Sequence, residues 1–375
     1  MGLVLTSEQD QLRDAVRRLC EPLGDPAGIR RRMETAEGFD PGTHRRMAEE
    51  LGLYGLTVPA EHGGAGATFA EAMLVIEELG RVLWGGPYFA TVAMAVPLLL
   101  ACGDPAAEKD HLPGIASGRT TATVAVAGPE GSWDESAVPA VEAAQRGTGW
   151  ALTGVRGHVI DGHTAGLLLV LARTPAGSGV FAVERAAPGV VTTALPALDQ
   201  TRKLARVTFD AAPARLVGAD GAGWAAVSSM LDLAAVALAA EQLGGAQRVL
   251  DLTVDYAMTR EQFGRPIGSF QAIKHKCADM LIRVESARSA VAYARWAAAA
   301  RSDDLPEVSS LAKAYCSEAF SFVAAEGIQI HGGIGFTWEH PAHLYLKRAK
   351  SSELLFGDPE QHRDRLLARI GVDDN

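Results

Sequence analysis

Cysteine is scarce in this chain, and the few that occur are far apart. The four cysteines, Cys20, Cys102, Cys277 and Cys316, form no CxxC pair. This spacing argues against a cysteine-rich metal centre and predicts four free thiols in a reducing compartment. The N-terminal sequence MGLVLTSEQDQL also lacks a basic segment followed by an apolar run, so it is not typical of a signal peptide. We therefore expect a cytoplasmic protein.

Basic residues are fewer than acidic residues in this chain. The chain has 35 Lys and Arg against 45 Asp and Glu, which gives a net charge of −10. A protein that binds nucleic acid needs Lys and Arg clustered on one face. We expect no nucleic-acid partner, whereas single cations can still bind small anions.

A long apolar run free of polar residues is absent as well. The most apolar region, residues 224–243, is rich in alanine and contains Ser228, Ser229, Asp232 and Glu241. A membrane-spanning helix needs about 20 predominantly apolar residues. We interpret this region as a helix buried among other helices, and we expect no membrane partner.

Aromatic residues are also few, at 6%, beside 48% hydrophobic and 21% charged residues. This balance is typical of a globular protein with closely packed helices. A chain of 375 residues is too long for one ordinary hydrophobic core, so two or three packed units are expected.

The spacing of apolar residues changes twice along the chain and predicts three domains. Residues 1–117 have helical spacing that begins with a capping box at Thr6 and Gln9. Residues 118–220 contain short strand-like runs separated by turn residues, which predicts an antiparallel sheet rather than alternating strands and helices. These runs are 121–127, 150–153, 166–172, 179–183 and 204–209.

Residues 221–375 are helical again, with breaks at 264–269, 303–306 and 332–335. The expected fold is therefore α+β. It consists of an N-terminal all-α domain, a middle antiparallel β domain and a C-terminal four-helix bundle.

The segment at residues 256–280, YAMTREQFGRPIGSFQAIKHKCADM, predicts two apolar helices joined by a polar loop. The first helix is expected to end near Arg260, because Gly264 and Pro266 do not continue a helix well. Ser269 is then placed to cap the next helix.

This loop combines one fixed cation, Arg260, with the amides of Gln262 and Gln271 and the ring of Phe263. A guanidinium stays charged and can bind two phosphate oxygens at once, so the set suits an anionic cofactor that carries an aromatic ring. The alternative is an arginine that satisfies the last carbonyls of its own helix.

A second glycine-rich segment, QIHGGIGF, occupies residues 329–336. Its glycines let backbone N–H groups approach an anion or a ring closely, although a plain turn between helices has the same composition. His331 is more typical of a packed histidine than of an acid or base. His340 and His343 have a spacing that a metal could use, but no further ligand accompanies them, so no metal is expected.

Together, these two segments resemble the acyl-CoA dehydrogenases. The second one continues as QIHGGIGFTWEHPAHLYLKRAK, and LGLYGLTVPAEHGGAG is similar to the N-terminal signature of that family. The order helix, sheet, helix matches the family's three-domain fold. The resemblance therefore covers nearly the whole chain.

The resemblance implies an FAD enzyme. Such an enzyme removes a proton from Cα of an acyl-CoA thioester while a hydride passes from Cβ to flavin N5, with electron-transfer flavoprotein as the expected acceptor. Members of the family share each flavin between subunits. By matching position, the residues that would hold its pyrophosphate and adenosine are Arg260, Gln262, Phe263, Gln271, Gln329, Ile330, His331, Gly332 and Gly333.

The residues expected around the flavin ring differ from the family pattern. The family has a Trp-Ile-Thr segment whose threonine bonds the flavin, and this chain has His158-Val159-Ile160 in its place. The family's Thr-Glu-Pro-Gly strand end corresponds to residues 127–130, Ala-Gly-Pro-Glu. The flavin ring is therefore expected to find few partners within this chain.

The catalytic base is missing from both places where the family carries it. The Tyr-Glu-Gly-Thr loop reads Leu-Phe-Gly-Asp here, with Phe356 at the glutamate, and the alternative position on the helix before the arginine loop is Ala234, beside Ala235. Glu241, two turns beyond Ala234 on nearly the same face, is the remaining candidate base. A structural glutamate bonded to a neighbour is the alternative for it. Asp232 and Asp358 are weaker candidates.

These observations predict a subunit of a hetero-oligomeric acyl-CoA dehydrogenase that supplies the pyrophosphate and adenosine half of the FAD site to a related partner chain. Bulky thioesters, such as those of steroid side chains or branched acids, are plausible substrates. Two alternatives stay open. One is an autonomous homotetramer that uses Glu241, and the other is a non-catalytic structural subunit that binds no flavin.

Overall fold

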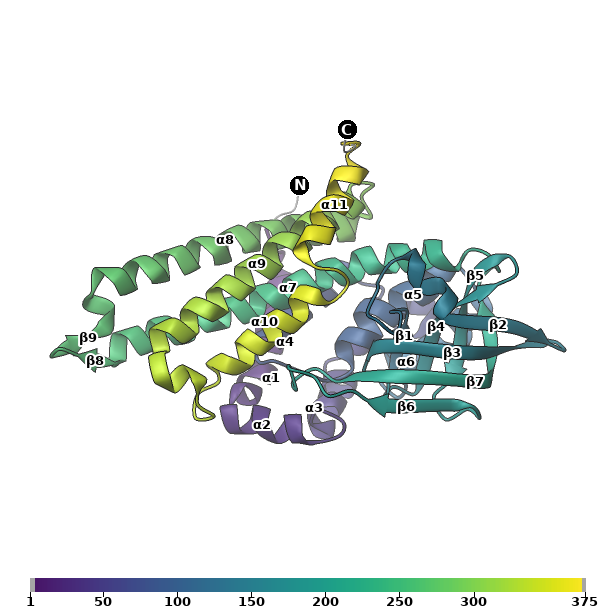
Figure 1. The fold of residues 1–375 in the computed structure, drawn as a ribbon, viewed down its shortest axis with the longest axis horizontal. Coiled ribbons are helices and arrows are strands. Elements are labelled where there is room, and N and C mark those ends of the chain that lie inside the picture. Colours follow the sequence, from purple (N-terminus) through teal and green to yellow (C-terminus); the bar gives the residue numbers. More distant parts are fainter. Residues whose placement is uncertain (1–3, 373–375) are drawn as a thin grey trace. The chain divides into compact units, whose positions relative to one another are not determined.

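The computed structural model describes residues 4–372, which form two compact units. One unit contains the chain up to Glu34, Phe69–Trp84 and the chain from Ala235 on, and the other contains Thr35–Thr68 and Gly85–Ala234. Helices precede and follow a sheet along the chain, so the fold is α+β as predicted (Figure 1). The three-domain boundaries stay a prediction, and their outermost residues, 1–3 and 373–375, lie outside the described part.

The helices of the first third begin at the predicted capping box. The Thr6 hydroxyl accepts a hydrogen bond from the backbone N–H of Gln9 at 3.3 Å. The Gln9 side-chain oxygen accepts one from the backbone N–H of Thr6 at 3.1 Å. The α-helices are α1 (Ser7–Cys20), α2 (Pro26–Glu34), α3 (Pro41–Arg45), α4 (Phe69–Arg81), α5 (Val96–Cys102) and α6 (Pro105–Ala116).

The sheet has seven strands, and its longest ladder joins β3 to β7. The strands are β1 (Ala122–Ala125), β2 (Val141–Arg146), β3 (Gly149–Ile160), β4 (Leu167–Thr174), β5 (Gly177–Glu184), β6 (Val190–Ala194) and β7 (Leu204–Val217). Their order is β1-β4-β2-β3-β7-β5, with β6 beside β7 and β4 also beside β5. Alternate residues such as Leu152, Phe181 and Val207 point into a common apolar core.

The sheet is mainly antiparallel, as predicted. Two pairings depart from this pattern, since β1 pairs with β4 in parallel and β2 meets β4 in parallel at Glu142 and Arg173. β2 and β6 were not predicted. β2 consists mostly of residues that rarely favour strands, and β6, within residues 4–372, has β7 as its one neighbour.

Five α-helices follow within the described residues, and three of the four breaks between them fall where the sequence predicts them, while the break at 355–358 was not predicted. They are α7 (Gly223–Thr259), α8 (Gln271–Ala300), α9 (Leu305–His331), α10 (Ala342–Leu354) and α11 (Pro359–Arg369). α9 packs against α8, α10 and α11. Among the described residues, α7 alone is long and apolar enough to cross a membrane by length and composition, and 61% of its most apolar window is buried in the protein.

Two glycines let α4 and α7 cross at backbone contact. A Cβ atom on Gly244 of α7 would lie 1.9 Å from the carbonyl oxygen of Glu77, and one on Gly80 of α4 would lie 2.3 Å from that of Glu241. Both neighbours are backbone atoms of regular helices, which cannot turn aside as a side chain can. This crossing therefore depends on the absence of a side chain at both positions.

Gly244→Ala is expected to lower the free energy of unfolding by about 1–3 kcal/mol, the usual effect of overpacking. Alanine normally stabilises a helix interior relative to glycine by about 0.5–1 kcal/mol. A decrease in the free energy of unfolding on this substitution would therefore indicate the clash. Chemical denaturation gives the measurement. Gly149→Ala is the control, since its Cβ would meet nothing nearer than an oxygen at 3.9 Å. Equal midpoints for the two variants would contradict the close crossing.

Candidate functional site

The predicted polar loop is a tight hairpin. α7 ends at Thr259, and β8 (Glu261–Gln262) pairs with β9 (Arg265–Pro266) through a two-residue turn. Phe263 and Gly264 in this turn have φ of 55° and 74°, which is the backbone of a type I′ hairpin. The prediction that Ser269 caps the next helix is wrong. Ile267–Ser269 forms a short 3₁₀ turn, and α8 starts after Phe270 without a side-chain cap.

The four predicted cofactor-binding residues of this hairpin region are all exposed: Arg260, Gln262, Phe263 and Gln271. The Phe263 ring is 90% exposed. The Arg260 side chain forms no hydrogen bond or ion pair with any residue that the structure describes. Its guanidinium therefore does not satisfy the carbonyls of α7 and remains free for an external anion.

The glycine-rich segment lies at the end of α9. Gln329, Gly332 and Gly333 are exposed, whereas Ile330 and His331 are buried. A Cβ atom on Gly332 or Gly333 would meet nothing within 4 Å. Open space over two consecutive backbone units is the arrangement that an approaching phosphate or ring requires.

The two predicted segments meet through a ring pair. His331 stacks on Tyr256 with 4.5 Å between ring centroids, and its Nδ1 lies 2.6 Å from the Gly327 carbonyl oxygen. Burial lowers the pKa of His331. Since Tyr256 lies one turn before Arg260, the stack positions the hairpin next to the glycine turn. Sequence reasoning did not assign Tyr256 a role, although its position one turn before a candidate cation was a usable signal.

Further histidine and tryptophan rings pack at the C-terminal end of α9. His331 lies 4.2 Å from His340 between centroids, and burial lowers the pKa of His340 to about 4, so both rings are neutral near pH 7. Trp338 contacts His343 and lies under the Lys347 ammonium at 4.9 Å. Within residues 4–372, no group of three or more His, Cys, Asp or Glu is arranged to hold a metal ion. These histidines act as packed rings.

The β unit differs at the place expected for the flavin ring. Ile160, at the position where the resemblance places the threonine, is 2% exposed, and its carbonyl accepts a hydrogen bond from the Thr123 hydroxyl at 2.6 Å. His158 has a φ of 50° beside an irregularity in the pairing of β3 with β7. Its ring atoms lie 3.5–3.6 Å from the position that a Cβ of Gly131 would take. The strand here offers packing and no hydroxyl.

Arg156 fixes the loop beside this strand. Its guanidinium is fully buried and donates hydrogen bonds to four backbone carbonyls, those of Val126, Ala137, Val138 and Leu171. Burial lowers the pKa of Arg156 to about 9. The guanidinium is thus committed to the fold of the β unit.

The candidate base Glu241 lies in a buried ion pair. Its Oε1 is 3.0 Å from the Arg348 guanidinium on α10, and the two side chains are only 7% and 2% exposed. This geometry favours the structural alternative that the sequence left open. Arg348 was not singled out, because it lies within the basic run KRAK, which is typical of a solvated helix face.

The other candidate positions carry either an apolar side chain or an aspartate. Phe356 is 1% exposed and has a φ of 65°, and Ala234 and Ala235 are buried in α7. Asp358 is the N-cap of α11, where it forms a capping box with Gln361. Asp232 is partly exposed on α7.

A buried lysine holds the loop that contains Phe356. Lys313 on α9 donates to the Ser317 hydroxyl at 2.9 Å and to the carbonyls of Glu353 and Gly357, both at 3.0 Å. Burial lowers the pKa of Lys313 to about 7, and burial lowers that of nearby His362 to about 3. Lys313 is thus a structural residue, one that sequence reasoning missed although it is a lone cation in an apolar stretch.

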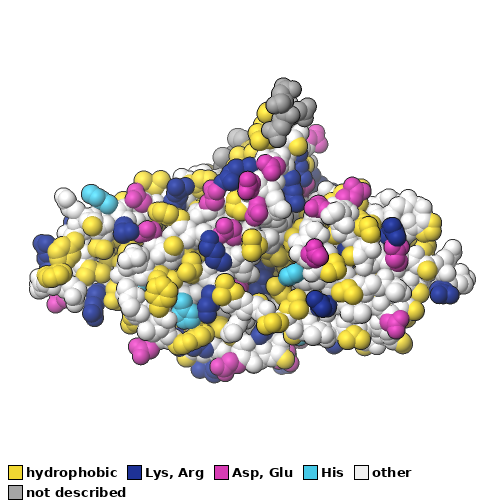
Figure 2. Space-filling model, viewed as in Figure 1, with side chains coloured by type: hydrophobic (Ala, Val, Ile, Leu, Met, Phe, Trp, Pro, Cys, Tyr) yellow, Lys and Arg dark blue, Asp and Glu magenta, His cyan; other side chains and the backbone are white. Residues whose placement is uncertain are grey.

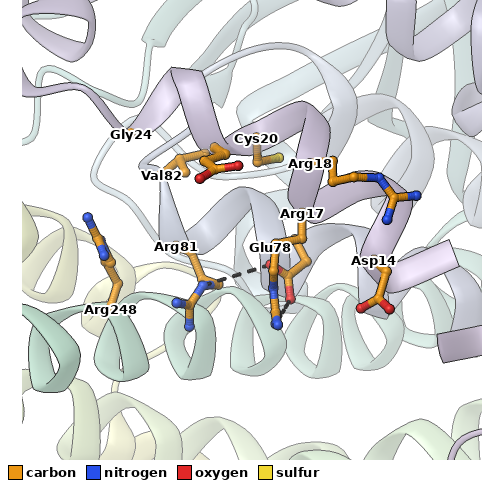
Figure 3. A pocket seen from close by; sticks show the side chains of 10 residues that line it. Asp14, Arg17, Arg18, Cys20, Gly24, Glu78, Arg81, Val82 and Arg248 are labelled. Atoms are coloured by element: carbon orange, nitrogen blue, oxygen red, sulfur yellow. Dashed lines mark hydrogen bonds and ion pairs between the residues drawn. The ribbon is translucent and has the colours of Figure 1, made fainter. Parts of the chain in front are cut away.

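The pocket in Figure 3, about 470 Å³ in volume, belongs to a different region of the same unit. Glu78 lines it, is 1% exposed and accepts two hydrogen bonds from Arg17, at 3.0 and 2.6 Å. Arg81 lies 3.8 Å from Glu78 and 2.8 Å from Asp251. None of the predicted cofactor-binding residues lines this pocket, and its charges mainly join α1, α4 and α7.

On the face that Figure 2 presents, charges of one sign do not gather. Figure 2 shows Lys and Arg interspersed with Asp and Glu over the face that it presents. The exposed rings of Phe263, Phe336 and Trp338 are more distinctive, at 90%, 73% and 55% exposed.

Comparison with known proteins assigns the chain to a family. Family models described as the N-terminal and C-terminal domains of acyl-CoA dehydrogenase match residues 6–119 and 221–371. Acyl-CoA dehydrogenase IpdE2 of Mycolicibacterium smegmatis is 35% identical over 371 residues, which cover 98% of this chain and 100% of that protein.

Solved structures of related proteins are similar to this chain over nearly its whole length. A chain of the ChsE4-ChsE5 complex from Mycobacterium tuberculosis is similar with a TM-score of 0.91 and 30% identity, covering 100% of both chains. A variant described as the Tcur3481-Tcur3483 steroid ACAD is similar with a TM-score of 0.87 and 32% identity, covering 97% of this chain and 98% of that one. This chain therefore belongs to the acyl-CoA dehydrogenase family, whose members are FAD-dependent oxidoreductases that act on acyl-CoA.

Proposed function

We propose that this chain is the subunit of a hetero-oligomeric acyl-CoA dehydrogenase that contributes the pyrophosphate and adenosine half of an FAD site seated mainly in a related partner. One contrast carries the proposal. Arg260, Gln329, Gly332 and Gly333 are exposed and their two segments are adjacent, whereas the positions expected for the flavin threonine and the base carry Ile160, Phe356 and Ala234.

The chain's own residues fit this role. Arg260 would bind two oxygens of the pyrophosphate, because its guanidinium has no competing partner among the described residues. The backbone at Gly332 and Gly333 would approach the adenosine side, and the exposed Phe263 ring would cover an aromatic surface. The FAD itself supplies the hydride acceptor for α,β-dehydrogenation of the thioester.

The partner would supply the groups that this chain lacks, namely a carboxylate near Cα and a hydroxyl near the flavin ring. The similarity to a chain of the ChsE4-ChsE5 complex supports a related subunit as that partner. Similarity to a steroid ACAD supports bulky, ring-bearing thioesters as substrates. Electron-transfer flavoprotein as acceptor and a cytoplasmic location complete the proposal.

Flavin occupancy tests the subunit assignment. The chain is purified alone and after co-expression with its genomic neighbour, and flavin absorbance per polypeptide is measured. We expect little flavin in the lone chain and full sites in the complex. Full occupancy and acyl-CoA oxidation by the lone chain would instead establish an autonomous homo-oligomer. Flavin in neither preparation would favour a non-catalytic scaffold.

Arg260→Ala in the complex is expected to weaken FAD binding by about 1.5–3 kcal/mol, because a charge-assisted contact is lost. Equilibrium dialysis against FAD measures the change. Arg265→Ala is the matched control, since this cation of the same hairpin lies over the Phe270 ring at 4.2 Å. Equal affinities for the two variants would remove Arg260 from the site.

Glu241→Gln is expected to lower the free energy of unfolding by about 3–5 kcal/mol, since it leaves the buried Arg348 guanidinium without its charge partner. The double variant Glu241→Leu with Arg348→Met is expected to regain most of that stability and to retain turnover in the complex. Denaturant titration and an α-proton exchange assay measure the two effects. A well-folded double variant without α-proton exchange would identify Glu241 as the base after all.

A further inference from the structure

Three aromatic rings contact one another in series at the C-terminal end of α9, within one compact unit. Tyr256 of α7 stacks on His331 with 4.5 Å between ring centroids, and His331 lies 4.2 Å from His340. We call these three residues the ring trio. Because Tyr256 lies one turn before Arg260, the ring trio joins the hairpin to the segments on both sides of the glycine turn, Gly332–Phe336.

The hydrogen bonding of His331 excludes a second proton on its ring. Its Nδ1 lies 2.6 Å from the Gly327 carbonyl oxygen, which can only accept, so Nδ1 carries the proton and donates. Its Nε2 is buried without a hydrogen-bond partner among the described residues, and the residue is 4% exposed. A proton on Nε2 would be a buried donor without an acceptor, which is unfavourable. The ring therefore stays neutral as long as it stays in place.

His340 excludes a second proton for a different reason. Its Nδ1 accepts a hydrogen bond from the backbone N–H of Ala342 at 3.2 Å, so its own proton is on Nε2. A proton added to Nδ1 would face that N–H group and break the hydrogen bond. Burial lowers the pKa of His331 and lowers that of His340 to about 4, in agreement with this geometry.

The groups around the ring trio make an imidazolium still less favourable. His331 and His343 of α10 add to the effect of burial on the pKa of His340. Burial, Lys347 of α10 and Arg30 of α2 in turn lower the pKa of His343. Neither His331 nor His340 forms an ion pair with a carboxylate in the part of the chain that the structure describes. A charge on either ring would therefore have no anionic partner there.

We propose that the ring trio is an acid-sensitive contact, which holds the Arg260 hairpin next to the glycine turn only while His331 and His340 are neutral. Uptake of a proton by either ring requires that ring to leave its place, and the hairpin then separates from the turn. His340 is a positioning residue, because it acts on the hairpin through His331. The consequence for FAD rests on the proposed function. Once Arg260 and Gly332 separate, the half-site is no longer preorganised and FAD binds more weakly.

The open and closed forms of this contact bind different numbers of protons. In the open form the imidazoles are solvated and have the ordinary pKa of 6.5, whereas in the closed form the pKa of His340 is about 4. The open form therefore binds more protons, and acid favours opening below about pH 6.5. For His340 alone, these values raise the opening equilibrium about twentyfold between pH 7 and pH 5.

Hydrogen–deuterium exchange of the full chain alone tests the contact without flavin. The informative amides are those of Arg260 and Ile267, which donate at 2.8 Å to the carbonyls of Tyr256 and Arg260. After correction for the intrinsic rate, their exchange relative to that of α4 is expected to accelerate about tenfold or more from pH 7 to pH 5. A constant ratio would overturn the proposal.

Two substitutions at His340 separate the ring from its titration. His340→Phe keeps an aromatic ring without titrating nitrogens, so it is expected to keep the hairpin protected at pH 7 and to reduce the acid response. His340→Ala removes the ring and is expected to accelerate hairpin exchange at pH 7 about two- to tenfold, the effect of one lost ring pair. His275→Gln, which removes an exposed histidine of α8, is the control and should respond as the natural chain does. Acid responses of equal size in His340→Phe and the natural chain would contradict the role of His340.

FAD affinity in the complex separates this inference from the proposed function. Equilibrium dialysis is expected to show weaker FAD binding at pH 5 than at pH 7, with a smaller loss for His340→Phe. A hairpin that opens in acid while FAD affinity stays constant would confirm the acid-sensitive contact and contradict the FAD half-site. A loss of FAD affinity without faster hairpin exchange would contradict the acid-sensitive contact.

Discussion

The buried pair of Glu241 and Arg348 is an interaction that constrains how the C-terminal helices pack. It joins α7 to α10 at 3.0 Å with both charges almost completely removed from water. Neither charge can be buried alone without a large loss of stability. The pair also stands two turns from Ala234, so the leading candidate base in α7 is committed to holding helices together.

Other polar side chains near the expected catalytic positions also form hydrogen bonds that stabilise the fold. Lys313 supports the backbone of the loop that carries Phe356, Asp358 caps α11, and Arg156 bonds four carbonyls of the β unit. In each case a polar group of suitable chemistry is used for folding. Arg260, Gln329 and the two exposed glycines, in contrast, remain accessible in the described structure, and they are the residues that we propose for half of a flavin site.

Several features of the fold could be predicted from the sequence. Helix breaks at the hairpin and at Gly332 follow from glycine and proline, and the capping box at Thr6 follows from local hydrogen bonding, so short-range chemistry fixed them. The Tyr256–His331 stack and the Glu241–Arg348 pair join residues 75 and 107 positions apart. Pairings over such distances are decided by packing, which no single segment encodes. The parallel β1–β4 contact and the edge strand β6 escaped prediction for the same reason, and Ser269 failed as a cap because the hairpin delays the start of α8.

The central claim is that an FAD molecule lies across two different chains. A cryo-electron-microscopy structure of the FAD-loaded complex tests it most directly. The account predicts the pyrophosphate within ion-pair distance of Arg260, the adenosine against Gly332 and Gly333, and the isoalloxazine ring on the partner's sheet. An isoalloxazine ring bound against His158–Ile160 of this chain, with Arg260 in solvent, would contradict it.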